Sequence, residues 1–220
     1  MKSAENPPEF LIDTPPEGKS RALPFAFAHG AGAPMDTPFM AFFAAGLAAR
    51  GWRVVRFEFP YMARRRREAK RPPPDRQPVL LDSWRRVIAE LESRQVPGRL
   101  VIGGKSMGGR MASLIADEAG VAGLVCLGYP FHPAGKPERL RTEHLAELRT
   151  PCLICQGTRD ALGCAEEVAG YALAGSIRLH WAPDGDHDLK PRKASGRTAE
   201  QNWAEAVAAI DGFLRDLAGG

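Results

Sequence analysis

The stretch most suggestive of chemistry is GGKSMGGR at residues 103–110, where four glycines surround one serine. Gly104, Ser106 and Gly108 fit the pattern G-x-S-x-G between a predicted strand and a predicted helix. There, glycines allow a tight turn that presents the serine hydroxyl as a nucleophile, because larger side chains would collide with the strand and the helix. The alternative is a glycine-rich loop whose serine only caps the helix.

A nucleophilic serine needs a base, and the base needs an acid that orients it. Five histidines could serve as the base: His29, His132, His144, His180 and His187. We predict His187, in DGDHDL, because it lies between the last predicted strand and the last predicted helix. A loop at that place overhangs the sheet edge that carries the serine.

The orienting acid should also follow a strand. Asp160, in QGTRD, comes directly after the apolar run PCLICQG, and the chain order Ser106, Asp160, His187 is one in which serine triads occur. Three rivals flank the histidine: Asp184, Asp186 and Asp188. We predict Asp160, since a neighbour in the same short loop rarely reaches back to its own histidine with good geometry. The alternative for Asp160 is a solvated turn residue.

Backbone N–H groups must hold the negative charge that develops on an attacked carbonyl oxygen. We predict that one donor is the N–H of Met107, which follows the serine and opens a helix. The other is predicted in HGAG, directly after the first strand, as the N–H of Ala31 with Gly32 as the alternative. His29 is interpreted as a structural loop residue rather than a catalyst.

These candidates depend on a regular alternation of short apolar runs and helical patterns. Strands are predicted at residues 24–29, 52–59, 99–104, 123–129, 151–157 and 177–182. Helices are predicted at residues 37–50, 79–95, 107–119, near 164–172, and from Thr198, where Gln201 completes a capping box. The alternation predicts an α/β fold with a mostly parallel sheet of about six to seven strands and helices on both faces. Ligands bind such sheets beyond the carboxyl ends of the strands.

The length of 220 residues fits a single domain, in which residues 1–20 form an N-terminal extension or an edge segment. Two polar connections, at 60–78 and 130–149, interrupt the alternation and are expected over or beside the carboxyl edge. The first contains four consecutive arginines at 64–67, followed by Lys70 and Arg71. We interpret this run as a solvated loop; the alternative is that one or two of its arginines bind an anionic substrate group.

Several residues that follow strands or flank the HGAG loop are candidate substrate contacts, although each could equally belong to the core. They are Gly32, Tyr61, Met62, Arg64, Lys105 and Tyr129. Lys105 is the least determined, because its charge could meet the substrate or simply reach solvent.

Composition narrows the class of protein. With 44% hydrophobic and 25% charged residues, the chain is typical of soluble globular proteins, and no apolar run approaches the ~20 residues of a membrane span. The first ten residues lack a signal-like apolar core, so a cytoplasmic location is expected. A net charge of +4 without interleaved aromatic residues does not indicate nucleic-acid binding. Cys152 and Cys155 would point to opposite faces of a strand, so no metal or redox site is expected.

Taken together, HGAG, GGKSMGGR, GTRD and GDHDL resemble the α/β-hydrolase superfamily over about residues 24–217. The spacing and the stretch FEFPYM are similar to a small lidless bacterial group of predicted hydrolases, related to dienelactone hydrolases and to the hydrolase-like domain of a chromatin-complex subunit. Dienelactone hydrolases use a cysteine nucleophile, so Ser106 argues against that activity here.

The resemblance implies a single-domain fold with a minimal lid or none. It also implies a serine hydrolase that acts on a small ester, thioester or related acyl compound without a metal or an organic cofactor. The alternative is a protein-interaction module on the same fold, since a fold does not fix a function.

Overall fold

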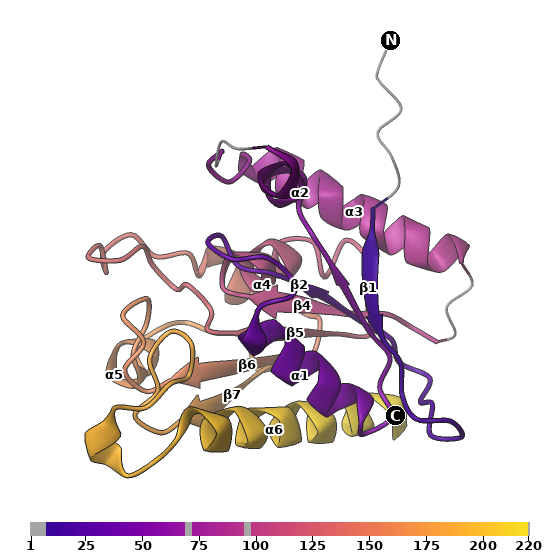
Figure 1. Cartoon of the computed structure of the whole chain (residues 1–220). Coiled ribbons are helices and arrows are strands. Elements are labelled where there is room, and N and C mark those ends of the chain that lie inside the picture. The colour runs from indigo at the N-terminus through magenta and orange to yellow at the C-terminus, as the bar shows by residue number, and fades with distance from the viewer. Residues whose placement is uncertain (1–7, 69–71, 95–97, 220) are drawn as a thin grey trace.

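The computed structural model describes residues 8–68, 72–94 and 98–219. Within these ranges seven strands form one sheet in the order β1-β3-β2-β4-β5-β6-β7 (Figure 1). Their bounds are Phe10–Asp13 for β1, Phe25–Ala28 for β2, Val54–Phe57 for β3, Val101–Lys105 for β4, Gly123–Leu127 for β5, Cys152–Gly157 for β6 and Ile177–Ala182 for β7. Strands β2 to β7 are parallel and only β1 is antiparallel to its neighbour, which confirms the predicted α/β sheet.

Strand β1 is the edge segment within the first twenty residues. It pairs with β3, and a bidentate ion pair joins the two strands: the Arg56 Nε and Nη2 atoms lie 2.9 and 3.0 Å from the Asp13 carboxylate oxygens. Arg56 is buried, so this pair is shielded from solvent. The four residues of β1 are too few to give a clear alternation in the sequence.

Helices cover both faces of the sheet (Figure 1). Their bounds are Pro38–Ala48 for α1, Pro60–Arg67 for α2, Gln77–Ser93 for α3, Met107–Ser113 for α4, Ala165–Val168 for α5 and Ala199–Gly219 for α6. Side chains alternate along β2, so Phe25 and Phe27 pack against α1 and α6, while Ala26 and Ala28 face α2, α3 and α4. Two apolar cores therefore hold the sheet between two helical layers.

Two predicted helix starts have the expected caps. The Thr37 hydroxyl accepts a hydrogen bond from the N–H of Met40, and Pro38 occupies the first turn of α1. At α6, the Thr198 hydroxyl accepts from the N–H of Gln201, whose side-chain oxygen accepts from the N–H of Thr198. Both arrangements satisfy N–H groups that a helix end would otherwise leave without acceptors.

Two segments differ from the sequence prediction. Residues 60–67 form the helix α2 rather than a loop, with Pro60 at its start and its arginines in the last turn, where their charge favours the helix end. Lys70 and Arg71 lie outside the described residues. Helix α4 ends at Ser113, earlier than predicted; in the turns beyond it, the Asp117 carboxylate accepts from the N–H groups of Arg149 and Thr150.

The cysteines are free thiols, three of them buried. Cys152 and Cys155 belong to different apolar cores on opposite faces of the sheet, as their spacing predicts. In the described ranges, no group of three or more histidine, cysteine or acidic side chains is placed to hold a metal ion. No helix in the same ranges is long and apolar enough to cross a membrane.

The parallel strands bring their carboxyl ends to one edge. In the register, Ala28 of β2 lies opposite Gly104 of β4, and Lys105 lies opposite Leu127 of β5. The residues that follow β2, β4, β6 and β7 therefore meet at this edge, although they are far apart along the chain.

Candidate active site

Ser106 occupies a strained turn between β4 and α4. Its φ of 51° and ψ of −116° are unusual for a residue with a side chain, and such conformations persist only where the surroundings impose them. The Ser106 N–H donates to the carbonyl of Leu127 at 2.9 Å, which anchors the turn to β5. The turn lifts the serine side chain out of the sheet edge, and the residue remains partly exposed.

The glycines around Ser106 are required by space. A Cβ atom on Gly104 would lie 2.6 Å from the carbonyl oxygen of Ala28, and one on Gly108 would lie 2.5 Å from that of His29. Cβ atoms at Gly103 and Gly109 would also overlap backbone atoms, at 1.9 and 2.6 Å. All four glycines therefore allow β2, β4, β5 and α4 to approach closely enough to form the turn.

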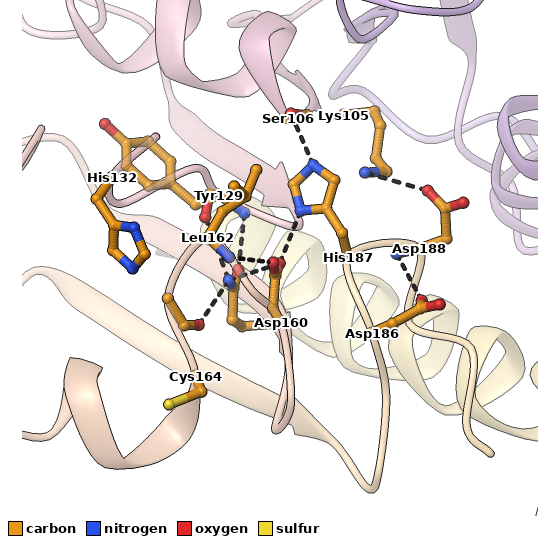
Figure 2. A network of polar contacts seen from close by, with 12 residues as sticks. Lys105, Ser106, Tyr129, His132, Asp160, Leu162, Cys164, Asp186, His187 and Asp188 are labelled. Atoms are coloured by element: carbon orange, nitrogen blue, oxygen red, sulfur yellow. Dashed lines mark hydrogen bonds and ion pairs between the residues drawn. The ribbon is translucent and has the colours of Figure 1, made fainter. Parts of the chain in front are cut away.

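Ser106, His187 and Asp160 form a continuous chain of hydrogen bonds (Figure 2). The Ser106 hydroxyl lies 2.8 Å from His187 Nε2, and His187 Nδ1 lies 2.8 Å from Asp160 Oδ2. Because Asp160 accepts at Nδ1, the neutral imidazole carries its proton there and leaves Nε2 free to accept the serine proton. The three side chains come from three different strand ends.

The Asp160 carboxylate is fully buried and held by further donors. The Gln156 side-chain amide donates to Oδ2 at 2.9 Å, and the Leu162 N–H donates to Oδ1 at 2.8 Å. Gln156 is itself fixed, because its oxygen accepts from the N–H of Tyr129 at 2.7 Å. These bonds leave the carboxylate one orientation, with an oxygen toward His187.

The three rival aspartates are bound elsewhere. Asp184 pairs with Arg192, and the Asp186 carboxylate accepts from the N–H groups of Asp188 and Lys190. Asp188 lies 3.3 Å from the Lys105 ammonium. The structure therefore brings only Asp160, of the four candidates, to the imidazole.

The Lys105 side chain does not extend into solvent. Its side chain is buried, lies 5.6 Å from the Phe39 ring centre and reaches Asp188 in the loop that carries His187 (Figure 2). Burial lowers the pKa of Lys105, and the Asp188 charge counteracts this. Burial, the largest single influence, pushes the pKa of Asp188 upward, but the charge and hydrogen bond of Lys105 together with the Lys190 charge bring the pKa below its ordinary value. The pair thus links the residue before the serine to the residue after the histidine.

The loop after β2 lies beside the serine and is held from beneath by His29. Its Nε2 accepts from the Phe59 N–H at 3.1 Å, so its proton lies on Nδ1, which donates to the Gly30 carbonyl at 2.6 Å. Burial lowers the pKa of His29, which keeps the ring neutral. His29 is therefore a structural loop residue, as interpreted from the sequence. The loop runs past Ala31 to Gly32, which is exposed.

No residue that the structure describes competes as an acceptor for the two predicted oxyanion donors. Met107 is the first residue of α4, so its N–H lacks an acceptor within the helix. The Ala31 N–H makes no hydrogen bond to any residue that the structure describes. Both groups flank Ser106, one along the chain and one across the sheet edge.

Three of the predicted substrate contacts have side chains with partners other than the triad. Met62 and Tyr129 are buried in the apolar core on the face of the sheet that α2, α3 and α4 cover, and the Tyr129 hydroxyl donates to the Arg141 carbonyl at 3.1 Å. Arg64 pairs with Asp75 at 2.5 Å, so its charge is already balanced. Apolar packing places Met62 and Tyr129, whereas an ion pair places Arg64.

Arg64 also lines a cavity of about 570 Å³ between α2 and α3. No residue of the Ser106, His187 and Asp160 chain lines this cavity. Its other charged residues are Glu9, Glu58, Arg66, Arg67 and Arg86. Three arginines of the run, Arg64, Arg66 and Arg67, therefore border a cavity that the triad does not line.

A second serine and histidine pair offers a useful contrast. His144 Nε2 lies 2.8 Å from the Ser113 hydroxyl, which itself donates to the Arg110 carbonyl. Ser113 must then accept from His144, so Nε2 carries the proton and cannot act as a base. Of the remaining histidines, His132 pairs with Glu167, and His180 lies in β7.

His144 makes stability depend on pH. Burial, with the nearby Arg110 charge, lowers its pKa to about 4. Between the unfolded value near 6.5 and this folded value, the unfolded chain binds a proton that the folded chain does not, so the free energy of unfolding falls as pH falls. At pH 5 the expected loss is below about 2 kcal/mol, because the ring is partly exposed and solvent screens part of the effect. Urea unfolding of wild type and His144→Gln at pH 7 and pH 5 measures this loss of free energy of unfolding. An equal loss in the two proteins would exclude His144 as the cause.

Sequence reasoning missed Gln156 and the pairing of Lys105 with Asp188. A signal for Gln156 does exist: it is the one polar side chain in the apolar run CLICQG, two positions before the turn that carries Asp160. No sequence signal points to the ion pair of Lys105 and Asp188, because only the fold brings these two residues together.

Comparison with known proteins agrees with this architecture. The model of an alpha/beta hydrolase domain matches residues 21–215. An α/β serine hydrolase without lid from Xanthomonas campestris is 18% identical and has a TM-score of 0.73, covering 96% of this chain and 89% of that one. A serine hydrolase homologue from Coxiella burnetii is 19% identical with a TM-score of 0.72, covering 92% and 91%.

A dienelactone hydrolase from Anabaena variabilis is also similar, at 18% identity and a TM-score of 0.66, covering 96% of this chain and 99% of that one. At such identities the likeness shows the fold alone. The relation to the chromatin-complex subunit stays a prediction. The family match over residues 21–215, together with the seven-stranded sheet, places the chain in the α/β-hydrolase family.

Proposed function

We propose that this hydrolase cleaves a small ester, thioester or related acyl compound through a covalent acyl-serine intermediate. The observation that carries the proposal is the unbroken hydrogen-bond chain from Ser106 through His187 to the buried Asp160. Nucleophile, base and orienting acid are within reach of one another, and the base has the tautomer that the reaction needs. The structural relative without lid from Xanthomonas campestris supports a hydrolase with an open site.

In the first half of the reaction, Ser106 Oγ attacks the acyl carbon while His187 Nε2 takes its proton. The carbonyl oxygen becomes negatively charged and accepts hydrogen bonds from the N–H groups of Met107 and Ala31. Asp160 stabilises the imidazolium. The intermediate then expels the alcohol or thiol, which takes the proton from His187 and leaves the acyl group on Ser106.

In the second half, His187 removes a proton from water as the water oxygen attacks the acyl-serine carbon. Collapse of this second intermediate returns the proton to Ser106 Oγ and releases a carboxylic acid. The proposed steps balance in atoms and charge with the chain's own residues and water. We propose a small-molecule acyl compound as the binding partner; neither nucleic acid nor a membrane enters the reaction.

A fluorophosphonate probe tests the proposal directly, because it phosphonylates an activated serine. We expect one label per chain, located on the peptide that contains Ser106, together with hydrolysis of short p-nitrophenyl esters. Ser113 is the internal control, since it also lies beside a histidine but is buried and faces a protonated nitrogen. Failure to label under conditions that label a known serine hydrolase would favour the interaction-module alternative.

A panel of esters and thioesters with acyl chains of increasing length would then define the substrate class. Single Arg→Ala changes in the arginine run, compared on anionic and neutral esters, test whether that run selects charge. Given the pairing of Arg64 with Asp75, we expect little change in KM for either ester.

A further inference from the structure

We propose that α2 orients the oxyanion hole through the Tyr61 hydroxyl and the Arg65 guanidinium, which makes both of them positioning residues. The inference rests on the proposed function, because an oxyanion hole matters only if Ser106 attacks an acyl group. It gives the basic helix α2 a part in catalysis without contact between its arginines and the substrate.

The argument begins with the geometry of a peptide unit. In a trans peptide, the C=O and the N–H that follows it point in opposite directions. No cis peptide bond occurs in the part of the chain that the structure describes. The direction of the Ala31 N–H is therefore set by whatever holds the Gly30 carbonyl, and that of the Gly32 N–H by whatever holds the Ala31 carbonyl.

The Gly30 carbonyl is held by two buried donors. His29 Nδ1–H donates to it at 2.6 Å, and the Tyr61 hydroxyl, whose single hydrogen is shared between the Gly30 and Ala31 carbonyls, lies 3.2 Å away. Both side chains have no exposed surface, so the carbonyl is drawn toward the interior under α2. The Ala31 N–H must then point away from α2.

The Ala31 carbonyl is turned toward the same helix. The Tyr61 hydroxyl lies 3.1 Å from it, and Arg65 Nη1 donates to it at 3.3 Å. The Gly32 N–H therefore also points away from α2. Two successive N–H groups that point the same way form a concavity that suits an anion.

Ser106 lies against this loop. A Cβ atom built on Gly30 would be 3.6 Å from Ser106 Cβ and 3.5 Å from Lys105 Cγ. Among the residues described, neither the Ala31 nor the Gly32 N–H has an acceptor. Two free donors beside the nucleophile are what a developing oxyanion requires.

The chemistry of Tyr61 and Arg65 suits this role. Burial raises the pKa of Tyr61 above its ordinary value, so the phenol stays protonated and remains a donor. The Arg65 guanidinium lies 5.0 Å from the Tyr61 ring centre, and its Nε donates to the Pro72 carbonyl at 2.8 Å. Arg65 thus ties the oxyanion loop to the chain beyond α2, whereas its neighbour Arg66 pairs with Glu58.

Tyr61→Phe tests the inference, because it removes one hydroxyl and keeps the ring. We expect kcat on p-nitrophenyl acetate to fall about 10- to 100-fold with KM within about 2-fold, since misdirected donors affect the transition state more than the bound ester. A trifluoromethyl ketone, to which Ser106 adds to form an oxyanion, should lose affinity by the same factor as kcat/KM.

Two matched controls accompany this variant. Tyr171→Phe removes the same group from a tyrosine that packs on Phe131, and Arg67→Ala removes an exposed charge from α2. Both controls should keep wild-type kcat and ketone affinity. Arg65→Ala should lose about 3- to 10-fold in kcat and in ketone affinity, and Arg65→Lys should recover part of both losses.

The inference is overturned if Tyr61→Phe keeps the kcat and ketone affinity of Tyr171→Phe while Ser106→Ala is inactive; the proposed function would then survive. It is also overturned if the lost activity matches only a lost folded fraction, seen as a lower melting temperature with unchanged ketone affinity. Full activity of Ser106→Ala would overturn the inference and the proposed function together.

Discussion

Ser106→Ala is expected to lower kcat for ester hydrolysis about 10⁵- to 10⁶-fold, to the level of the uncatalysed reaction assisted by binding alone. Alanine keeps the turn between β4 and α4 but has no oxygen to attack the acyl carbon. The remaining parts, His187 and the N–H donors, cannot form an acyl-enzyme without it. Steady-state hydrolysis of p-nitrophenyl acetate and the mass shift after fluorophosphonate treatment measure the effect.

Ser113→Ala is the matched control, because it removes the other serine hydroxyl that lies 2.8 Å from a histidine nitrogen. We expect this variant to keep wild-type kcat and to be labelled at Ser106. Circular dichroism should show both variants folded. If Ser106→Ala kept measurable acyl-enzyme formation, another nucleophile would have to be sought and the proposed reaction abandoned.

Asp160→Asn is expected to lower kcat about 10³- to 10⁴-fold while leaving the fold intact. The amide nitrogen must take the place of one of two oxygens, and both oxygens now accept hydrogen bonds. Facing His187, the amide donates to Nδ1 and forces the proton to Nε2, which can no longer accept from Ser106. If the amide nitrogen faces the Leu162 N–H instead, two hydrogen-bond donors oppose each other and neither has an acceptor. In either orientation the negative charge beside the imidazolium is lost.

The measurement is the pH dependence of kcat/KM for Asp160→Asn beside Asp184→Asn, a control aspartate from the loop before His187. Asp184 pairs with Arg192 and Arg159 rather than with His187, so its replacement should change the rate less than about 3-fold. The assignment would be wrong if Asp160→Asn remained near wild type while a change at Asp186 or Asp188 removed activity.

Much of the fold could be predicted from the sequence because its signals are local. A buried parallel strand needs a short apolar run, and a helix start needs a cap within a few residues, as at Thr198. Six of the seven strands were visible in this way. The short β1 and the arginine-rich α2 were not, because four residues show no clear period and an arginine run carries no apolar face.

The candidate site could be predicted to the same extent. The glycines around Ser106 reflect backbone crowding that the sequence displays directly, and chain order favoured Asp160 and His187. The substrate contacts were harder to predict, because the side chain of an aromatic residue or a methionine after a strand can point into the core or toward the surface. Tyr129 and Met62 turned into the core, where burying an apolar side chain is favourable.

The sequence by itself determined the order of six strands and five helices, the tight turn at Ser106 and the short set of residues able to complete a triad. The tertiary structure alone decided which aspartate reaches His187, that Lys105 pairs with Asp188, and that Tyr61 lies under the loop after β2. The physical reason is range: a turn or a cap depends on residues a few positions apart, whereas these contacts join residues about 30 to 80 positions apart, which only sheet register and helix packing bring together.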